Sequence, residues 1–348
     1  METIFVTGAS GYIGSHTCLL LLNMGCEVYA LDSYVNSYEA SLKKVINISN
    51  QRSLDKGKLH IYKGDIRDKN TLRNIFFQAR KNGKTIESVM HFAGLKSIKE
   101  SMINPYEYWD NNVNGSINLF NIMNENDCHK IVFSSSATIY GQKSHDNIDE
   151  NSPIFPSNTY GNTKYTIEKI LTDIFDRTNG KWRIANLRYF NPIGAHESGE
   201  IGENPKGIPN NIFPLITRVA AGQKEKLEIY GNDWDTIDGT GVRDYIHVMD
   251  LAEGHIKALE FLSSEKPQII NINLGTGFGT SVLELINVFQ KVNNIEIPYK
   301  FGLRRTGDLA RVVADSSFAK RKLNWSPKRS IEKMCKDGWK WQEKNKKI

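Results

Sequence analysis

The amino-acid sequence predicts an α/β protein in which helices cover both faces of a doubly wound parallel sheet. Three observations support this fold class. Short apolar runs rich in β-branched residues alternate with helical patterns in the first half of the chain. Turn residues follow these runs, as they do at the carboxyl edge of open sheets. The 348 residues can bury a large core and are enough for two lobes.

A predicted strand, a glycine turn and a helix open the chain. Residues 3–7 (TIFVT) are expected to form a buried strand, and residues 15–22 (SHTCLLLL) a helix. Between them, Gly8, Gly11 and Gly14 follow a G-x-x-G-x-x-G spacing, which differs from the G-x-G-x-x-G of simpler dehydrogenases. Glycines permit a tight turn and let backbone N–H groups at a helix N-terminus approach a pyrophosphate. This segment therefore predicts a dinucleotide site.

A carboxylate ends the second predicted strand. Residues 27–31 (EVYAL) lead to Asp32. A carboxylate in this position accepts hydrogen bonds from the adenosine ribose and repels a 2′-phosphate. Because no arginine occurs among residues 33–37 (SYVNS), we expect NAD rather than NADP. The alternative is that Asp32 is only a turn residue at the end of the strand.

Two further strands are expected at residues 59–62 and 88–92, with a helical pattern at 71–81 between them. Open α/β sheets bind their ligands at the carboxyl ends of the strands. Asp65, just after the first of these strands, is a candidate to hold an adenine. Ala93-Gly94, after the second, would let a cofactor pass close to the backbone.

A serine, a tyrosine and a lysine carry the candidate chemistry. Ser136 follows the predicted strand 131–133, and Tyr160 and Lys164 are four residues apart, so they share one face of a helix. An ammonium group beside a cationic nicotinamide favours phenolate, so the pKa of the tyrosine would fall from about 10 toward neutral pH. The set predicts carbonyl/alcohol redox chemistry on a nicotinamide. The alternative is a helix surface pair without function.

Composition argues against several other classes. The net charge of +6 is diffuse, with basic residues gathered mainly at 344–347 (KNKK), which we interpret as a solvated terminus. No basic stripe with interleaved aromatic residues predicts nucleic-acid binding. The four cysteines lack metal-ligand spacing, and Cys18 is interpreted as a core thiol. We find no signal peptide and no membrane-spanning apolar run, so we expect a cytoplasmic protein without metal, nucleic-acid or membrane partners.

After residue 190 the pattern becomes less regular. Residues 191–211 are rich in Gly, Pro and Asn and predict a long functional loop. Further expected elements are a helix at 212–221, a strand at 227–230, a polar loop at 231–241, a helix at 251–262 and a strand at 269–275. Arg243 and one arginine of the RRTGD segment (304–308) are candidates to clamp a diphosphate. The alternative is that they pair with Asp244 and Asp308.

Five sequence blocks carry a family resemblance: HFAGLK (91–96), DNNVNG (110–115), FSSSATIYG (133–141), LRYFNPIGAH (187–196) and GTGVRDYIHVMDLA (239–252). With the glycine fingerprint, they resemble the extended short-chain dehydrogenase/reductase family, and within it the UDP-glucose/UDP-galactose 4-epimerases. The resemblance implies a Rossmann-type NAD domain at 1–190. It also implies a smaller, mixed α/β UDP-sugar lobe at 191–348, from which roughly 239–275 returns to the NAD domain.

The resemblance also implies catalytic roles. Tyr160 would take the proton from the sugar 4-hydroxyl while hydride leaves C4 for a tightly held NAD, which is regenerated in each cycle. Ser136 would hold the same oxygen. Lys164 would lower the pKa of Tyr160 and contact the nicotinamide ribose. The 4-keto sugar would then rotate about its link to the fixed diphosphate and take hydride back on its other face.

Binding residues follow from the same resemblance. The implied NAD site comprises Gly8, Gly11, Tyr12, Ile13, Gly14, Asp32, Ser33, Asn36, Asp65, Ile66, Phe92, Ala93, Gly94, Lys96, Asn111, Ser134, Tyr160, Lys164 and Tyr189. The implied UDP-sugar site comprises Lys96, Ser136, Ala137, Thr138, Tyr160, Phe190, Asn191, Asn210, Asn211, Tyr230, Arg243, Arg305, Asp308 and Val312. Arg243 and Arg305 would hold phosphate, and Asp308 the uridine ribose.

Related activities are less well supported. Sugar-nucleotide 4,6-dehydratases typically need an Asp-Glu pair beside the serine or threonine, and decarboxylating relatives usually carry a Glu there. Ala137 and Thr138 occupy these places and cannot do that acid–base work. A non-catalytic regulator that binds NAD or a UDP-sugar is a further alternative, against which the intact Ser136, Tyr160 and Lys164 argue.

Two finer expectations concern the substrate and the assembly. Val312 stands where the family often has a bulky tyrosine or a small cysteine or serine, beside the C2 substituent of the hexose. We therefore expect acceptance of N-acetylated UDP-hexoses as well, unless Val312 merely packs and other residues close the pocket. The family is usually a homodimer, for which the candidate helices are roughly 111–125 and 159–177.

Overall fold

The computed structural model describes residues 2–52, 57–141, 147–207, 209, 211–305 and 307–345. Chain contacts divide the protein into two compact units. The first contains Met1–Ile139, Phe155–Arg188 and Ala252–Ile272, and the second contains Tyr140–Ile154, Tyr189–Leu251 and Asn273–Ile348. The expected NAD-domain and sugar-lobe boundaries stay predictions, because compactness alone does not assign a ligand to a unit.

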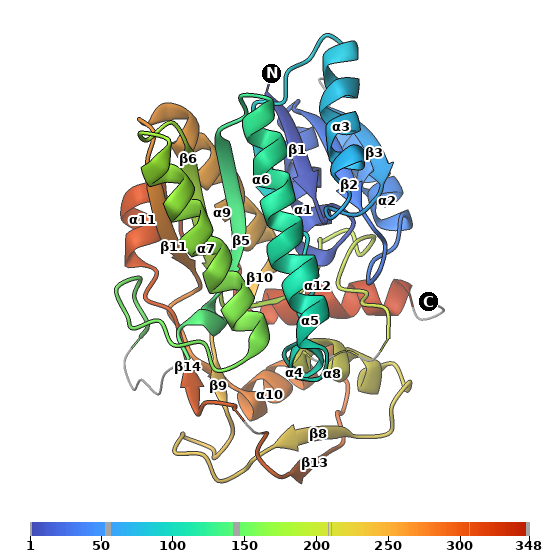
Figure 1. Ribbon diagram of the computed structural model, residues 1–348. Coiled ribbons are helices and arrows are strands. Elements are labelled where there is room, and N and C mark those ends of the chain that lie inside the picture. The colour runs from blue at the N-terminus through green and yellow to red at the C-terminus, as the bar shows by residue number, and fades with distance from the viewer. Residues whose placement is uncertain are drawn as a thin grey trace. The chain divides into compact units, whose positions relative to one another are not determined.

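A seven-stranded sheet forms the centre of the first unit (Figure 1). Its order is β11-β6-β5-β4-β1-β2-β3. The bounds are β1 Thr3–Thr7, β2 Glu27–Asp32, β3 Lys58–Lys63, β4 Ser88–His91, β5 Lys130–Ser136, β6 Arg183–Tyr189 and β11 Ile269–Leu274. Val6 of β1 pairs in parallel with Ala30 on one side and Met90 on the other. The predicted doubly wound parallel α/β fold is confirmed.

Helices cover both faces of this sheet, which is why β1 and β2 are buried along their whole length. Those of the first unit are α1 Tyr12–Asn23, α2 Ala40–Arg52, α3 Lys69–Lys81, α4 Ile98–Ile103, α5 Pro105–Tyr108, the π-helix η1 Trp109–Asn114, α6 Gly115–Glu125, the 3₁₀ turn η2 Ala137–Ile139, α7 Thr159–Arg177 and most of α9 Val248–Ser264. Helices α3, α6 and α7 share one core cluster, in which Ile75, Phe120 and Leu171 pack with Phe5 and Phe133 of the strands.

The second unit is smaller and mixed. Its short pairs are β7 Asn191–Ile193 with β10 Tyr245–His247, β8 Leu227–Tyr230 with β13 Tyr299–Gly302, and β9 Val242–Arg243 with both β12 Thr280–Ser281 and β14 Arg311–Val312. Its helices are α8 Ile212–Ala220, α10 Val282–Asn293, α11 Ser317–Leu323 and α12 Ile331–Lys344. Phe213, Leu285, Phe289 and Trp339 pack together in its core.

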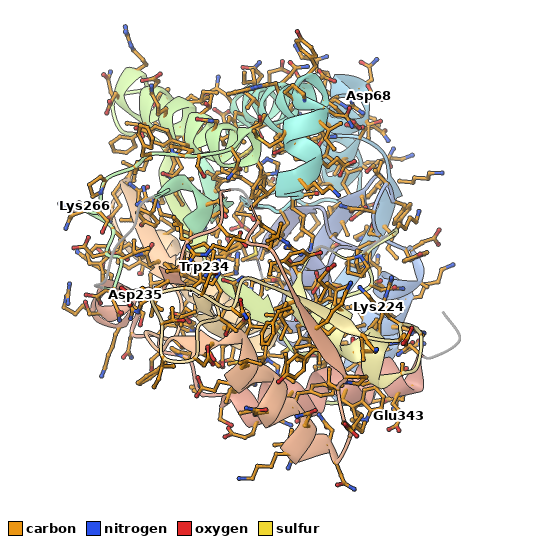
Figure 2. The ribbon with its side chains drawn as sticks, turned by 90° about the horizontal axis from the view of Figure 1, so that it is seen from below. Asp68, Lys224, Trp234, Asp235, Lys266 and Glu343 are labelled. Carbon is orange, nitrogen blue, oxygen red and sulfur yellow. The ribbon has the colours of Figure 1, made fainter. Side chains whose placement is uncertain are left out.

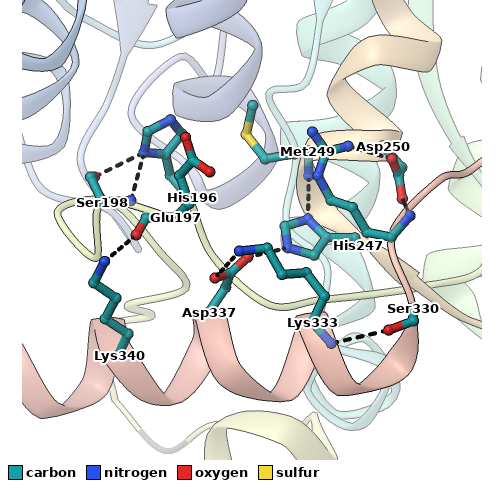
Figure 3. A network of polar contacts seen from close by, with 11 residues as sticks. His196, Glu197, Ser198, His247, Met249, Asp250, Ser330, Lys333, Asp337 and Lys340 are labelled. Atoms are coloured by element: carbon teal, nitrogen blue, oxygen red, sulfur yellow. Dashed lines mark hydrogen bonds and ion pairs between the residues drawn. The ribbon is translucent and has the colours of Figure 1, made fainter.

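A buried polar network ties α12 to β10 (Figure 3). The Nδ1 atom of His247 accepts a hydrogen bond of 3.0 Å from the N–H of Met249, so Nε2 carries the proton and donates to Asp337 Oδ2 at 3.2 Å. Lys333 Nζ donates to the same carboxylate at 2.9 Å. Burial raises the pKa of Asp337, but the hydrogen bonds from His247 and Lys333 outweigh it and leave the pKa below its ordinary value.

Most expected elements lie where the sequence placed them, although several differ in their bounds: α1 begins at Tyr12 rather than at Ser15, and β5 extends to Ser136. Part of the expected loop 191–211 forms the strand β7, in which Ile246 of β10 is the register partner of Pro192. Helix α9 begins at Val248 rather than at Leu251. Among the described residues, no helix has both the length and the apolar character needed to cross a bilayer.

Candidate active site

The glycine turn between β1 and α1 forms a close-packed cradle. Gly8 has a φ of +67°, and a Cβ there would lie 2.6 Å from the backbone nitrogen of Ala93. A Cβ on Gly14 would lie 2.3 Å from the carbonyl oxygen of Gly8. Within the described chain, Gly11 precedes α1 without a side-chain cap, so the first N–H groups of the helix remain available to an anion. The cradle therefore fits a pyrophosphate.

Asp32, at the end of β2, is fixed by the turn that follows it. Its Oδ2 atom accepts from the N–H of Ser10 at 2.8 Å, and its Oδ1 atom accepts from the N–H of Tyr34 at 2.8 Å and the hydroxyl of Ser37 at 2.7 Å. These contacts are the ones expected if Asp32 serves as a turn residue at the end of β2, which was the alternative interpretation. Each carboxylate oxygen can accept two hydrogen bonds, so Oδ2 retains one acceptor position beyond the contact with Ser10.

Asp65, after β3, forms an ion pair that the sequence analysis did not predict. Arg67 donates from Nη2 to Asp65 Oδ2 at 2.7 Å and from Nη1 to Asp110 Oδ2 at 2.8 Å. Burial raises the pKa of Asp65, but hydrogen bonds from Arg67 leave it below its ordinary value. Asp65 is therefore an anchored carboxylate at the carboxyl edge of the sheet.

The loop after β4 is held by a residue that sequence reasoning missed. Asn112 is buried in the π-helix η1 and brackets Leu95: its Oδ1 accepts from the Leu95 N–H at 2.8 Å, and its Nδ2 donates to the Leu95 carbonyl at 3.0 Å. The same Nδ2 lies 3.1 Å from Thr163 Oγ1 on α7. The neighbouring Asn111, the predicted NAD contact, is only partly buried. A π-helix has no sequence signal comparable to the α-helix period, which explains the omission.

Ser136, Tyr160 and Lys164 lie together in the first unit. A hydrogen bond with the Ser136 hydroxyl lowers the pKa of Tyr160, but the loss of hydration is larger and raises this pKa to about 12. Lys164 Nζ lies 5.9 Å from the centre of the Tyr160 ring and donates to the Ser134 carbonyl at 2.6 Å. Burial lowers the pKa of Lys164 to about 7.

The expected lowering of the Tyr160 pKa is therefore not found in the protein chain alone. The expectation included the positive charge of a nicotinamide, whereas the side chains by themselves provide a partly charged lysine and a poorly hydrated phenol. Thr138, the second residue of η2, donates from Oγ1 to Ser136 Oγ at 2.9 Å. The Ser136 hydroxyl thus has contacts with both Thr138 and Tyr160.

In the second unit, two arginines stack on aromatic rings. The Arg305 guanidinium lies 3.9 Å from the centre of the Tyr230 ring, and that of Arg304 lies 4.1 Å from the Trp234 ring. Figure 2 labels Trp234, in the loop after β8. Arg304 also donates from Nε to Asp233 at 2.7 Å. Tyr230 and Arg305, two residues predicted to bind the UDP-sugar, are thus in contact with each other.

Arg243 does not form the alternative pair with Asp244. Its Nη1 atom donates to the carbonyls of Val242 and Leu309, each at 2.9 Å. The buried Asp244 instead accepts hydrogen bonds from Thr276, Gly277 and Ala314. Val312 of β14 is the register partner of Arg243, so the predicted phosphate and hexose contacts occupy adjacent strands.

The remaining predicted site residues have the following positions. Tyr12 and Ile13 begin α1, Ser33 and Asn36 follow β2, Ile66 is buried after β3, Phe92 and Lys96 follow β4, Ala137 begins η2, and Tyr189 ends β6. Phe190, Asn191, Asn211 and Asp308 belong to the second unit. Asn211 precedes α8 and donates to Glu203 at 3.2 Å. Asn210 lies outside the described residues. Throughout the described part of the chain, no group of three or more His, Cys, Asp and Glu side chains is arranged to bind a metal.

Comparison with known proteins agrees with these observations. The family model for GDP-mannose 4,6 dehydratase matches residues 5–338. The UDP-glucose 4-epimerase of Bacillus subtilis (strain 168) is 48% identical, over 98% of this chain and 97% of the relative. The solved UDP-glucose 4-epimerase from Bifidobacterium longum, in complex with NAD⁺ and UDP, has a TM-score of 0.92 and 42% identity, and the match covers 99% of each chain.

A third match is more distant. The solved UDP-Glc/GlcNAc 4-epimerase from Campylobacter jejuni has a TM-score of 0.82 and 30% identity, over 99% of this chain and 100% of that one. The matches to the relatives run almost end to end, as do the sequence blocks that carry the resemblance. The chain belongs to the UDP-glucose 4-epimerase family, within the extended short-chain dehydrogenases/reductases that the GDP-mannose 4,6-dehydratase model describes.

Proposed function

We propose that this protein is an NAD-dependent 4-epimerase that interconverts UDP-glucose and UDP-galactose through a transient 4-keto sugar. The observation that carries the proposal is the grouping of Ser136, Tyr160 and Lys164 in a unit that also holds the glycine cradle. A relative with 48% identity bears the name of this activity. When bound, NAD supplies a reversible hydride acceptor.

The chain's own groups would hold this cofactor at several points. The cradle of Gly8, Gly11 and Gly14 presents the N-terminus of α1 to the pyrophosphate. Asp32 would accept from a ribose hydroxyl, which is the basis for proposing NAD rather than NADP. We assign the other predicted cofactor contacts on the same resemblance.

Tyr160 is the proposed base for the sugar 4-hydroxyl, and Ser136 the partner that orients the same oxygen. A phenol with a pKa of about 12 is a weak proton acceptor at neutral pH. Positive charge near the ring lowers this pKa, and the Lys164 ammonium supplies part of that positive charge. Proton transfer at Tyr160 is thus expected to depend on the charge state of Lys164.

UDP is proposed to bind in the second unit, with Arg243 and Arg305 on the diphosphate, Asp308 on the ribose and Tyr230 beside the base. Epimerisation requires the keto sugar to present both faces, so UDP must be held firmly and the hexose loosely. Arginine forks suit this division, because they grip phosphate through paired hydrogen bonds.

N-acetylated UDP-hexoses are proposed as additional substrates. Val312 is smaller than a tyrosine and is only partly buried in the short strand β14. A 30% identical relative from Campylobacter jejuni is named as acting on both UDP-Glc and UDP-GlcNAc. The alternative remains that other side chains close the pocket around C2.

Epimerisation of UDP-Gal and of UDP-GalNAc, each assayed by product chromatography without added NAD, tests these proposals. We expect turnover of both substrates. Turnover of UDP-Gal alone would retain the epimerase and remove the N-acetyl activity. Turnover of neither substrate, even with NAD supplied, would favour a different sugar nucleotide or a binding protein.

A homodimer paired through residues 111–125, which span the end of η1 and α6, and through α7 (159–177) is also proposed. In the first unit, Met102 and Ile103 of α4, Trp109 of η1 and Ile117 of α6 are exposed by 60, 67, 40 and 37%. Apolar side chains on neighbouring elements favour a protein partner, and a second copy is the occupant that the family resemblance implies. A cytoplasmic location stays a prediction.

A further inference from the structure

Three consecutive serines at the end of β5 (134–136) contact one face of α7. The carbonyl of Ser134 accepts from Lys164 Nζ at 2.6 Å. The hydroxyl of Ser135 donates to Glu168 Oε1 at 2.5 Å. The hydroxyl of Ser136 forms a hydrogen bond with Tyr160, which lies two helical turns before Glu168 on α7. The strand end thus contacts three helix positions in succession.

Tyr160, Lys164 and Glu168 follow one another at four-residue spacing on α7. Residues four apart on a helix are neighbours on its surface. Tyr160 and Lys164 have roles in the proposed reaction, whereas Glu168 has none so far. Glu168 is nevertheless 4% exposed, which is unusual for a carboxylate that serves only solubility.

The carboxylate of Glu168 pairs with Arg188 of β6. The guanidinium donates from Nε to Oε1 at 3.1 Å and from Nη2 to Oε2 at 2.8 Å. Arg188 is only 1% exposed, so the two charges share one buried site. Three hydrogen bonds, two of them from a guanidinium, therefore hold the position of this carboxylate.

The surroundings of Lys164 act on its charge in both directions. Its ammonium lies 4.9 Å from the centre of the Phe133 ring, and burial lowers its pKa to about 7, while the charge of Glu168 raises it. Two further titratable groups near it are Tyr160 and His91, whose pKa values of about 12 and about 3 leave both neutral at pH 7. With Arg188 positive, Glu168 is the one anion in this set.

We infer that Glu168 is a positioning residue for the proposed epimerisation, which keeps the Lys164 ammonium charged and directed at the Ser134 carbonyl. The inference rests on the proposed function. Ser135 and Arg188 hold the carboxylate of Glu168 in position. The negative charge of this carboxylate favours the ammonium form of Lys164, and the ammonium in turn favours ionisation of Tyr160. Glu168 thus acts through Lys164 and contacts no reacting atom.

A charged Lys164 has a consequence that does not require turnover. An ammonium beside the nicotinamide disfavours the cationic oxidised ring relative to the neutral reduced ring. The ratio of NADH to NAD⁺ affinity therefore reports the charge on Lys164. Equilibrating the full-length protein with a defined NADH/NAD⁺ mixture, followed by chromatography of the retained nucleotides, measures this ratio.

The test compares the unchanged protein with Glu168→Gln between pH 6 and pH 9. Glutamine keeps one acceptor oxygen for Ser135 or Arg188, removes the negative charge, and replaces the other acceptor by an amide donor, so one hydrogen bond from Arg188 is lost as well. We expect the pH at which turnover and the NADH preference change with Lys164 ionisation to fall by about one unit. Glu125→Gln, which breaks the exposed pair with Arg73, is the matched control and should leave both unchanged.

The outcomes separate this inference from a structural role and from the proposed function. Lower stability of Glu168→Gln with an unchanged pH profile and nucleotide ratio would overturn the inference. If UDP-hexose turnover is absent but the nucleotide ratio shifts, the inference about Lys164 holds and the epimerase proposal fails. If the unchanged protein retains neither nucleotide, both proposals are overturned.

Glu168→Asp is the second variant, for the case that Glu168→Gln does not fold. It withdraws the charge by the length of one methylene and should give a smaller shift in the same direction. No shift would contradict the inference.

Discussion

Burial acts in opposite directions on Tyr160 and Lys164, two residues one helical turn apart. Loss of hydration raises the pKa of the phenol to about 12 and lowers that of the amine to about 7. Both shifts favour the neutral form. In the protein chain alone, neutral pH therefore gives an un-ionised tyrosine and a lysine near its titration midpoint. The base becomes competent only when further positive charge enters the site.

Replacing Tyr160 by phenylalanine should lower turnover of UDP-Gal by about 10³-fold, because the proposed proton acceptor is lost. The loss of the hydrogen bond with Ser136 should cost only about 1 kcal/mol of unfolding free energy. Steady-state kinetics and thermal unfolding measure the two effects.

The matched control is Tyr165→Phe, at a partly buried position on the same helix, which should turn over normally. Normal turnover by Tyr160→Phe would contradict the assignment of the base. Unchanged biological action of an inactive Tyr160→Phe would instead support a non-catalytic regulator.

The sequence predicted two kinds of strand well: strands buried along their whole length, and β8, which was predicted at its observed bounds although only every second residue is buried. Strands β1 and β2 lie inside a parallel sheet, so they read as largely apolar runs followed by turn residues, whereas only the apolar part of β5, residues 131–133, was predicted. The strands β7 and β14, with three and two residues, depend on partners far along the chain and have no comparable local signal. Helix α10 had a readable signal that was missed: Ser281 and Glu284 form a capping box at its start.

In the candidate site, too, some residues could be predicted from the sequence and others could not. Gly8, Asp32 and Tyr160 could be predicted because their types and spacing are tied to chemistry. Asn112 and Glu168 could not, because each acts by contacting residues distant in sequence. Glu168 does carry a partial signal, since it continues the four-residue spacing of Tyr160 and Lys164 along one helix face.

The loop after β8 is expected to order the segment that carries Arg305. Trp234 stacks on Arg304 and donates from Nε1 to the Tyr230 carbonyl at 3.3 Å. Replacing Trp234 by alanine removes a cation–π contact of about 1 kcal/mol, so UDP affinity should fall about fivefold. Titration calorimetry with UDP measures the change.

Phe278→Ala provides the comparison, because this aromatic side chain is 79% exposed elsewhere in the second unit. It should bind UDP normally, and NAD retention should be normal in both variants. Unaltered UDP affinity of Trp234→Ala would show that the arginines of this segment are ordered without the stacking contact.

On the scale of the whole molecule, each unit is assembled from three separate stretches of chain. Sequence patterns predict contiguous elements, but long-range assembly is set by tertiary packing, as for the edge strand β11, which lies beside β6 in the sheet. Helix α12, near the carboxyl end, depends on such packing: Asp337 connects it to His247 of β10 (Figure 3).

Asp337→Asn should destabilise the second unit by about 3 kcal/mol at pH 7, because it breaks a buried charge network. The folded-state pKa of Asp337 is below its unfolded value, so its contribution is present above the unfolded pKa of about 4 and is lost as pH falls through the folded pKa. The difference between variant and unchanged protein should therefore shrink in acid. Urea unfolding at pH 7 and pH 3 measures it.

Glu343→Gln, at an exposed carboxylate on the same helix (Figure 2), is the control and should change stability by less than about 0.5 kcal/mol. A pH-independent loss of stability in Asp337→Asn would mean that packing of the side chain, rather than its charge, holds α12 in place.

All four cysteines are buried, and this has a practical consequence for observing the protein at work. Burial raises the pKa of every one of these thiols, to about 11 for Cys26 and to about 12 for Cys128 and Cys335. Maleimide dyes react with thiolates, so the native chain should label very slowly at neutral pH. A single cysteine introduced at Ile237, which is 96% exposed in the loop between β8 and β9, would then take up a fluorophore alone. The movements of that loop could be followed by fluorescence without first removing any native thiol.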